Sequence, residues 1–379
     1  MIDLGPLARL ALMGAVLALG PLAWFWVRHR GANATARQRA LTLLTLFLTF
    51  DLVLFGAFTR LTDSGLGCPD WPGCYGSASP LGARQQIDVA QSALPSGPVT
   101  HGKAWIEMIH RYLASAVGVL ILVLAALSWL AARRGQARVS PWWAGITLLW
   151  VCVQGAFGAL TVTMKLFPAI VTLHLLGGLI LLALLTCQSQ LLAPMPLPLP
   201  GRLKQGAMAV ALLATVQITL GGWVSTNYAV LACTDFPRCQ GSWWPPMNFS
   251  EGFTVWRELG AGSSGGFIQF SALTAIHYAH RLMAYALMAS MLALAWGLHR
   301  DGSAVPRRFA IGLASLVAWQ LFSGLSNVLL DWPLWGAVAH TAGAAGLVML
   351  LTTLLVRAFS GRHGGRAPGL SPDAMRANS

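Results

Sequence analysis

Two histidines that each precede an arginine lie at corresponding places in two separate apolar segments. His110 lies in the stretch EMIHRYLASA and His280 in the stretch AIHYAHRLMA. A single histidine on an apolar face is most often a packed core residue, but ionisable groups inside a membrane are costly and usually functional. Two further histidines complete a set of four, His174 in TLHLLGG and His340 in AHTAGA. Pairs of imidazoles are typical axial ligands of a haem iron.

The composition indicates which kind of protein must position these side chains. The chain has 379 residues, of which 56% are hydrophobic and 10% charged, and its mean hydropathy is +0.62. A soluble domain carries about a quarter charged residues, whereas a bilayer-crossing helix needs about 20 apolar residues. We therefore predict an all-α integral membrane protein. Its nine expected spans are residues 7–27, 40–58, 104–131, 141–162, 168–192, 205–225, 269–298, 307–330 and 334–357.

The distribution of charge predicts the orientation of these spans. A net charge of +13 would suit nucleic acid, but most of the 25 Lys and Arg residues fall in connections on one side of the spans. Such an excess marks the cytoplasmic side of a membrane protein. We expect a multi-pass protein of the cell inner (plasma) membrane, with the N-terminus outside and the C-terminus in the cytoplasm. Its surface partner is then membrane lipid and not nucleic acid.

The two long outer connections contain the stretches GCPDWPGC and ACTDFPRC. Cys68 and Cys74 are separated by five residues, as are Cys233 and Cys239. Pro, Gly and Asp between them favour segments that fold back. The outer face of a bacterial-type inner membrane is oxidising, so two short disulfides are expected. A zinc site is the weaker alternative, because no histidine lies at zinc-finger spacing.

Several segments recur along the chain. VQGAFGAL matches WQLFSGLS, and Gln154 precedes His174 by the same interval as Gln320 precedes His340. Units with an even number of spans begin on the same side, which gives a parallel repeat. We predict two tandem parallel four-helix bundle repeats plus one extra N-terminal transmembrane helix. The predicted divisions are 1–39 for the extra helix, 40–192 for the first unit, 193–204 for a Pro-rich linker, 205–357 for the second unit and 358–379 for a cytoplasmic tail. Matching FDLVLFGAFTRLT to VQITLGGWVSTN pairs Asp51 with Gln217.

The depth of the histidines is consistent with haem ligation. His110 and His174 each follow the expected start of a helix by six residues, which is about 9 Å along the axis. Imidazoles at matched depth on two helices of a bundle can hold a haem iron from both faces. Arg111 and Arg281 directly follow two of these histidines. They could pair with haem propionates or extend toward lipid headgroups, and the sequence leaves both open.

The stretches TRLTDSGLGCPDWPGC, EMIHR, TLHLLGG, HYAHR and AHTAGA together resemble the haem A synthase family over residues 40–357. That family oxidises a methyl group of haem O to a formyl group, which gives haem A for cytochrome oxidase. The resemblance implies a membrane haem-methyl oxidoreductase. Members of the family commonly have eight spans, so residues 1–39 are a departure from its pattern.

The resemblance also implies how the site residues divide. A substrate haem would lie between His110 and His174, and a permanent haem b between His280 and His340. The functional glutamate of the family falls on Glu107. Its first-loop cysteine pair falls on Cys68 and Cys74. Haem O and haem A are then the substrate and product, and a haem O synthase and a membrane or soluble electron-transfer protein are further partners to expect.

Glu107 distinguishes the two units. Aligning His110 with His280 places Glu107 opposite His277, one helical turn before each ligand. A carboxylate beside a substrate haem could assist proton transfer or stabilise a cation on the oxidised methyl group, whereas a haem that only passes electrons needs none. The alternative is that Glu107 is an interfacial surface residue.

Two other functions compete with haem oxidation. A di-haem b-type membrane electron carrier, such as a quinol oxidoreductase, explains four histidines but neither the Glu107 and His277 asymmetry nor the cysteine loops. A haem transporter or chaperone would use a tryptophan-rich outer motif, which GSWWPPMNF at residues 241–249 only faintly resembles.

Overall fold

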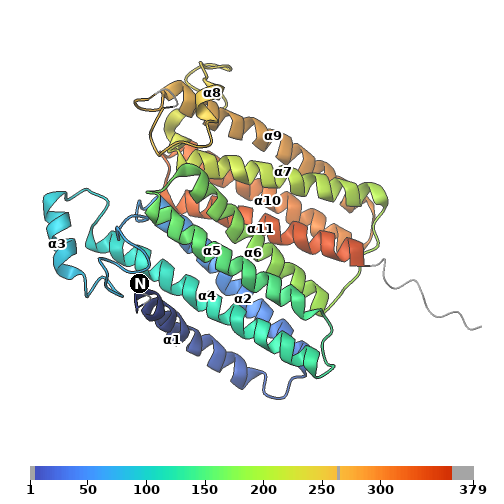
Figure 1. The fold of residues 1–379 in the computed structure, drawn as a ribbon. Helices are drawn as coiled ribbons and strands as arrows, with labels where there is room; N and C mark the ends of the chain where they lie inside the picture. The colour runs from blue at the N-terminus through green and yellow to red at the C-terminus, as the bar shows by residue number, and fades with distance from the viewer. Residues whose placement is uncertain (1–4, 263–264, 361–379) are drawn as a thin grey trace, which may run out of the picture.

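The computed structural model describes residues 5–262 and 265–360 as an assembly of helices (Figure 1). Within these residues, nine helices are long and apolar enough to cross a membrane. They are α1 (Gly5–Arg28), α2 (Ala34–Leu61), α4 (His101–Arg133), α5 (Pro141–Thr163), α6 (Pro168–Leu192), α7 (Gly201–Thr226), α9 (Phe270–Arg300), α10 (Ala304–Leu329) and α11 (Leu334–Phe359). The predicted all-α membrane protein with nine spans is confirmed.

The structure differs from the sequence-based expectations mainly outside the spans. The two long connections contain three short helices that the sequence did not predict: α3 (Arg84–Ala93), η1 (Ala229–Ala232) and α8 (Phe249–Gly252). In α3 only Ile87 is buried, so burial of apolar side chains contributes little to this helix. The helix α7 already begins at Gly201, directly after Pro200, so the last four residues of the predicted linker 193–204 are helical. Most of the predicted tail, residues 361–379, lies outside the described residues.

The eight membrane-spanning helices that follow α1 in the described residues form two groups that lie side by side (Figure 1). We call α2, α4, α5 and α6 with their connections the first half, and α7, α9, α10 and α11 with theirs the second half. In the first half α2 packs on α4 and α6, and α5 packs on the same two helices. In the second half α9 packs on α7 and α10, and α10 packs on α11. The helices α6 and α11 contact each other, so the seam between the halves runs along them.

The helix α1 lies outside the two groups and packs along α4. Gly14 allows the close approach, because a Cβ there would lie 2.8 Å from the carbonyl carbon of Ser115. Small residues at such crossings are typical of helix pairs in membranes, where van der Waals contact replaces the hydrophobic effect. The first half therefore carries a helix on one flank that the second half lacks.

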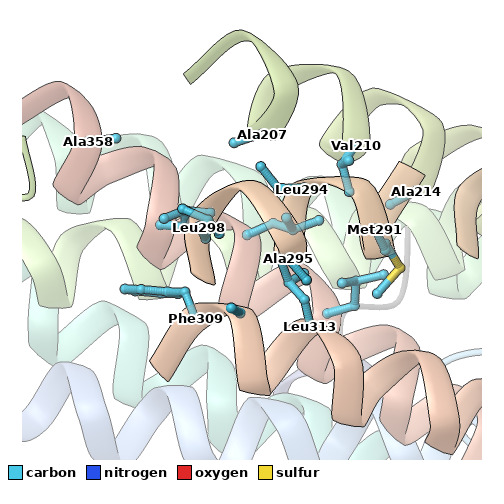
Figure 2. Packing of buried hydrophobic residues seen from close by; sticks show 14 of the residues in the cluster. Ala207, Val210, Ala214, Met291, Leu294, Ala295, Leu298, Phe309, Leu313 and Ala358 are labelled. Atoms are coloured by element: carbon cyan, nitrogen blue, oxygen red, sulfur yellow. The ribbon is translucent and has the colours of Figure 1, made fainter. Parts of the chain in front are cut away.

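Both cysteine loops lie at one end of the molecule, which we call the loop end (Figure 1). The connections from α1 to α2, α4 to α5, α6 to α7 and α9 to α10 lie at the opposite end, which we call the basic end. Each half has an apolar core of its own between these ends. The core of the second half joins residues of α7, α9, α10 and α11 and is drawn in Figure 2.

Candidate functional site

All four histidines predicted from the sequence point between helices near the loop end, and each meets a glycine of the neighbouring helix. A Cβ at each glycine would lie close to the Cε1 atom of the imidazole. The pairs are Gly56 with His110 (3.0 Å), Gly158 with His174 (3.6 Å), Gly221 with His280 (3.0 Å) and Gly324 with His340 (3.3 Å). Because glycine has no side chain, each imidazole can approach the neighbouring helix with its Cε1 atom closest. Each ring is thereby held in place by a helix other than its own.

The histidines come together in the pairs expected from the sequence. His110 on α4 and His174 on α6 are near enough for their imidazoles to interact electrostatically, and so are His280 on α9 and His340 on α11. Each pair therefore joins two helices of the same half. Two opposed imidazoles are what a haem iron needs, because the macrocycle supplies its other ligands.

The glycine contacts also correct the register between the halves. Gly56 and Gly221 meet their histidines in the same way, so Leu52, and not Asp51, corresponds to Gln217. Gln217 lies beside His280, with its Nε2 3.1 Å from Nδ1 of the imidazole. Asp51 is exposed on α2. The pairing of Asp51 with Gln217 read from the sequence is wrong by one residue.

The polar surroundings of the two histidine pairs differ. In the second half, the Nδ1 atom of His340 lies 3.0 Å from Oγ of Ser323, and the Nδ1 atom of His280 lies 3.1 Å from Nε2 of Gln217. In the first half, the Nδ1 atoms of His110 and His174 are buried and have no hydrogen-bond partner among the described residues. The ring of His110 instead stacks on an aromatic ring, that of Phe55, at 6.2 Å. A partner that accepts from Nδ1–H, as Oγ of Ser323 can for His340, fixes the tautomer and leaves Nε2 free to bind a metal. The amide N–H of Gln217 instead donates to the ring of His280.

Glu107 is buried, and both of its carboxylate oxygens accept hydrogen bonds. Its Oε1 accepts from Nη2 of Arg111 at 2.5 Å, and its Oε2 accepts from the backbone N–H of Cys68 at 2.8 Å. A carboxyl group that accepts at both oxygens, one of them from a guanidinium, is held as the anion. The alternative that Glu107 is an interfacial surface residue disagrees with its exposure of 4%.

Arg111 ties α4 to the first cysteine loop. Besides Glu107, it donates from Nη1 to the carbonyl oxygens of Asp70 (3.0 Å), Pro72 (3.2 Å) and Gly73 (2.5 Å). Its side chain is buried, which disagrees with extension toward headgroups. A haem propionate could reach this guanidinium only beside the loop carbonyls that already occupy its donors.

The second half repeats this arrangement with a neutral residue in place of the carboxylate. Arg281 donates from Nε to Nε2 of His277 at 3.2 Å, and Nδ1 of His277 lies 3.0 Å from the carbonyl oxygen of Ala229. The imidazole thus accepts at one nitrogen and donates at the other, which is the neutral form. The other donors of Arg281 reach the carbonyl oxygens of Asp235 (2.9 Å), Arg238 (2.9 Å) and Cys233 (2.8 Å).

The two cysteine loops have the same internal structure. Cys68 and Cys74 form one disulfide and Cys233 and Cys239 the other, in the pairing expected from the sequence. In each loop an aspartate accepts from two successive backbone N–H groups: Asp70 from Tyr75 and Gly76, and Asp235 from Gln240 and Gly241. Burial raises the pKa of Asp235, but these N–H groups outweigh it and the pKa lies below its ordinary value.

Sequence comparisons identify what this chain is similar to. Residues 39–353 match the COX15-CtaA family, described as "Cytochrome oxidase assembly protein". A "Heme A synthase" of Shewanella oneidensis is 37% identical over 315 residues, which cover 82% of this chain and 93% of the relative. A "Heme A synthase" of Methylobacterium sp. is 31% identical, covering 86% and 94%. That of Rhodospirillum centenum is 30% identical, covering 86% and 89%.

Proposed function

Since the chain belongs to the COX15-CtaA family of haem A synthases, and is a multi-pass membrane enzyme that makes haem A from haem O, we propose that its two halves bind two different haems. The first half binds the haem that is oxidised, and the second half holds a permanent haem b. The two halves are tandem parallel four-helix units, residues 40–192 and 205–357. The relatives support neither a di-haem electron carrier nor a haem transporter or chaperone.

The residues of the second half suit a resident haem b. His280 and His340 are near enough to interact electrostatically, each contacts a glycine of the neighbouring helix, and each has a polar side chain beside the imidazole. With Nδ1–H of His340 donating to Ser323, Nε2 is free to bind iron. An imidazole supported as His340 is by Ser323 holds a metal about 10- to 100-fold more tightly than an unsupported one. A haem b bound there would supply one-electron transfer.

The first half suits a haem that must enter and leave. His110 and His174 also contact glycines of neighbouring helices, but within residues 5–262 and 265–360 their Nδ1 atoms have no hydrogen-bond partner. Without that support their hold on iron is weaker, which suits a substrate that is released as product. Arg111 and Arg281 remain candidates for contact with haem propionates, at the loop end where both histidine pairs lie.

Glu107 is the observation that carries the assignment of chemistry to the first half. It stands one helical turn before His110 as a buried carboxylate, where the second half has the neutral His277. Its orientation is fixed by Arg111 and by the N–H of Cys68, so the negative charge is in place before the reaction. A preorganised charge stabilises the positive charge that develops as a ring methyl group is oxidised.

The orientation in the membrane follows from the basic end. We place that end in the cytoplasm, so the cysteine loops and both haem sites lie toward the oxidising outer face and the N-terminus lies outside. This side suits the disulfides. Haem O would arrive from a haem O synthase in the same membrane, and electrons would pass to or from a membrane or soluble redox partner.

Extraction and mass analysis of the haems in the purified protein test this function. We expect haem b together with haem O, haem A or a partly oxidised haem in the same preparation. Two haems b and no other haem would contradict the proposal and would favour an electron carrier.

A further inference from the structure

A row of polar side chains runs down the inside of the first half, from the histidines to the basic end. On α2 it begins below Gly56, the residue that meets His110. It continues through Thr49, Thr45, Thr42 and Gln38, which recur at intervals of three or four residues and so share the face of Gly56. All four side chains are buried.

The other helices of the first half add polar side chains to the same interior. On α4, Ser128 follows His110 by five helical turns. On α5, Gln154 and Thr147 precede Gly158 by one and three turns, and on α6 Gln188 follows His174 by about four turns. Each therefore lies on the face of its helix that carries the histidine or the glycine that contacts a histidine. All four are buried, with exposures of at most 8%. We call these eight residues of α2, α4, α5 and α6 the polar column.

The second half has apolar side chains at the corresponding places. Counting from Gly221, His280, Gly324 and His340 by the same intervals gives one residue for each member of the column. These are Ala214, Val210, Ala207 and Leu203 on α7, Leu298 on α9, Gln320 and Leu313 on α10, and Leu354 on α11. Six of them are buried members of the apolar core, five of which Figure 2 labels, and Leu203 packs against it. Only Gln320, which matches Gln154, is polar.

Helix packing alone does not account for this difference. Hydroxyl groups can help membrane helices to associate, but the second half packs four helices in the same way without them. Several hydroxyls of the column donate to the carbonyl oxygen four residues earlier, as Thr42 does to Gln38 at 2.8 Å and Thr49 to Thr45 at 2.7 Å. A hydroxyl bonded in this way can still accept from another donor.

Three members of the column have a buried polar atom without a partner among the described residues. These atoms are Oγ1 of Thr45, Oε1 of Gln188 and Oε1 of Gln154. A buried polar atom left without a partner is destabilising, and internal water is the usual partner of such atoms. Their position along one interior line points to water bound within the first half.

We propose that the polar column is a hydrated path that carries protons, with the water molecules that relay them, between the basic end and the haem site of the first half. Gln38 to Gly56 spans about 27 Å along α2, and successive members on that helix are about 5–6 Å apart. One or two water molecules bridge such an interval at ordinary hydrogen-bond distances. Gln154 occupies the level between Thr49 and the histidines.

The reaction moves protons at the haem site, whichever molecule supplies the oxygen atom, and the polar column would connect that site to the basic end. This step rests on the proposed binding of the substrate haem in the first half. With water as the source, R–CH3 and H2O give R–CHO, four protons and four electrons, which pass to a one-electron acceptor such as a haem or quinone. With O2 as the source, R–CH3, two O2, four protons and four electrons from a reductant of the same class give R–CHO and three H2O. Both routes move protons and water at the first haem site, whereas a haem that only passes electrons needs neither.

Radiolytic footprinting of the purified full chain tests the path without relying on activity. Hydroxyl radicals made from bound water label side chains beside it, so buried leucines report internal water. Leu124 and Leu185 line the first half, and Leu294 and Leu351 hold the corresponding places in the second; all four are buried. We expect the first two to be labelled several-fold faster than the second two. Equal rates in the two halves would overturn the proposal, whatever any variant does.

A triple variant, Thr42→Ala with Thr45→Val and Thr49→Ala, gives α2 the residues of the second half. We expect its Leu124 and Leu185 to be labelled as slowly as Leu294 and Leu351, and its haem A formation to slow about tenfold or more while haem b is retained. The control is Thr215→Val with Thr219→Val, which removes two hydroxyls from the exposed side of α7 and should change neither readout. Wild-type labelling and rate in the triple variant would contradict the path. If the column is wet but haem b does not depend on His280 and His340, the proposed division of haems fails and the path still stands.

Discussion

The two halves of this protein have the same scaffold and differ inside it. In both, two histidines contact glycines of neighbouring helices, and an arginine on a helix donates hydrogen bonds to a disulfide-containing loop. The first half places an anionic carboxylate one turn from its histidine, leaves its imidazoles unsupported and has a polar interior. The second half has a neutral histidine, supported imidazoles and an apolar interior. The shared features can hold a haem, so chemistry on a haem must come from the features that differ.

The largest effect is expected at the carboxylate. Glu107→Gln keeps an oxygen that can accept from Cys68 but removes the charge, so we expect haem A formation to fall about a hundredfold or more. Haem O or a partly oxidised haem should accumulate, and haem b should remain. Haem profiles of cells carrying the variant measure this. The matched control is His277→Gln in the second half, which should leave the rate of methyl oxidation near that of the wild type. A normal haem A level in Glu107→Gln would place the chemistry elsewhere.

The support of the second pair of imidazoles gives the next effect. Ser323→Ala removes the partner of Nδ1 of His340, so we expect haem b to be held about 10- to 100-fold less tightly. The measurement is the rate of haem b transfer to an apo-globin acceptor. Thr161→Ala removes a hydroxyl from the equivalent helix of the first half that has no contact with a histidine, and it serves as the control. Equal retention of haem b in both variants would remove this difference between the halves.

The glycines that contact the histidines allow each proposed haem site to be altered separately. A Cβ at Gly56 or Gly221 would lie 3.0 Å from an imidazole, which is tight enough to move the ring or the helix. We expect Gly56→Ala to lower turnover severalfold with haem b intact, and Gly221→Ala to lower haem b content. Absorption spectra and haem A yield separate the two outcomes. If both variants lost haem b alike, the sites would not be independent.

The smallest effect is expected at the disulfides. Each closes a short loop, so the loss of one costs about 2 kcal/mol in the free energy of unfolding by the chain-entropy account. Thiol labelling of denatured, unreduced protein should find only Cys152 and Cys187, the two free cysteines of the structure. Labelling of all six cysteines in protein prepared without reductant would show that the loops are open in the membrane.

Features that depend on local sequence could be predicted, and those that depend on helix rotation could not. Long apolar runs with few charged residues predicted the nine spans, and the spacing of Cys68 and Cys74 predicted their disulfide. The contact of Gly56 with His110 depends on how α2 is turned against α4, which no local pattern encodes. The same uncertainty produced the one-residue error that paired Asp51 with Gln217.

The surroundings of Arg111 and Glu107 show the same limit. The sequence places them one turn apart, but the loop carbonyls and the N–H of Cys68 that bind them come from some 40 residues earlier in the chain. The polar column could have been found from the sequence, since Gln38, Thr42, Thr45 and Thr49 recur at helical spacing. Its functional interpretation also needed the alignment of the two halves, which identifies the apolar residues of the second half at the corresponding positions.

The haem content of four single variants tests the division of labour most directly. His280→Ala and His340→Ala should each lose haem b, because in the proposed division these histidines are the ligands of the permanent haem. His110→Ala and His174→Ala should keep haem b and make no haem A. Loss of haem b from the first-half variants, with its retention in the second-half variants, would show that the two sites are assigned the wrong way round.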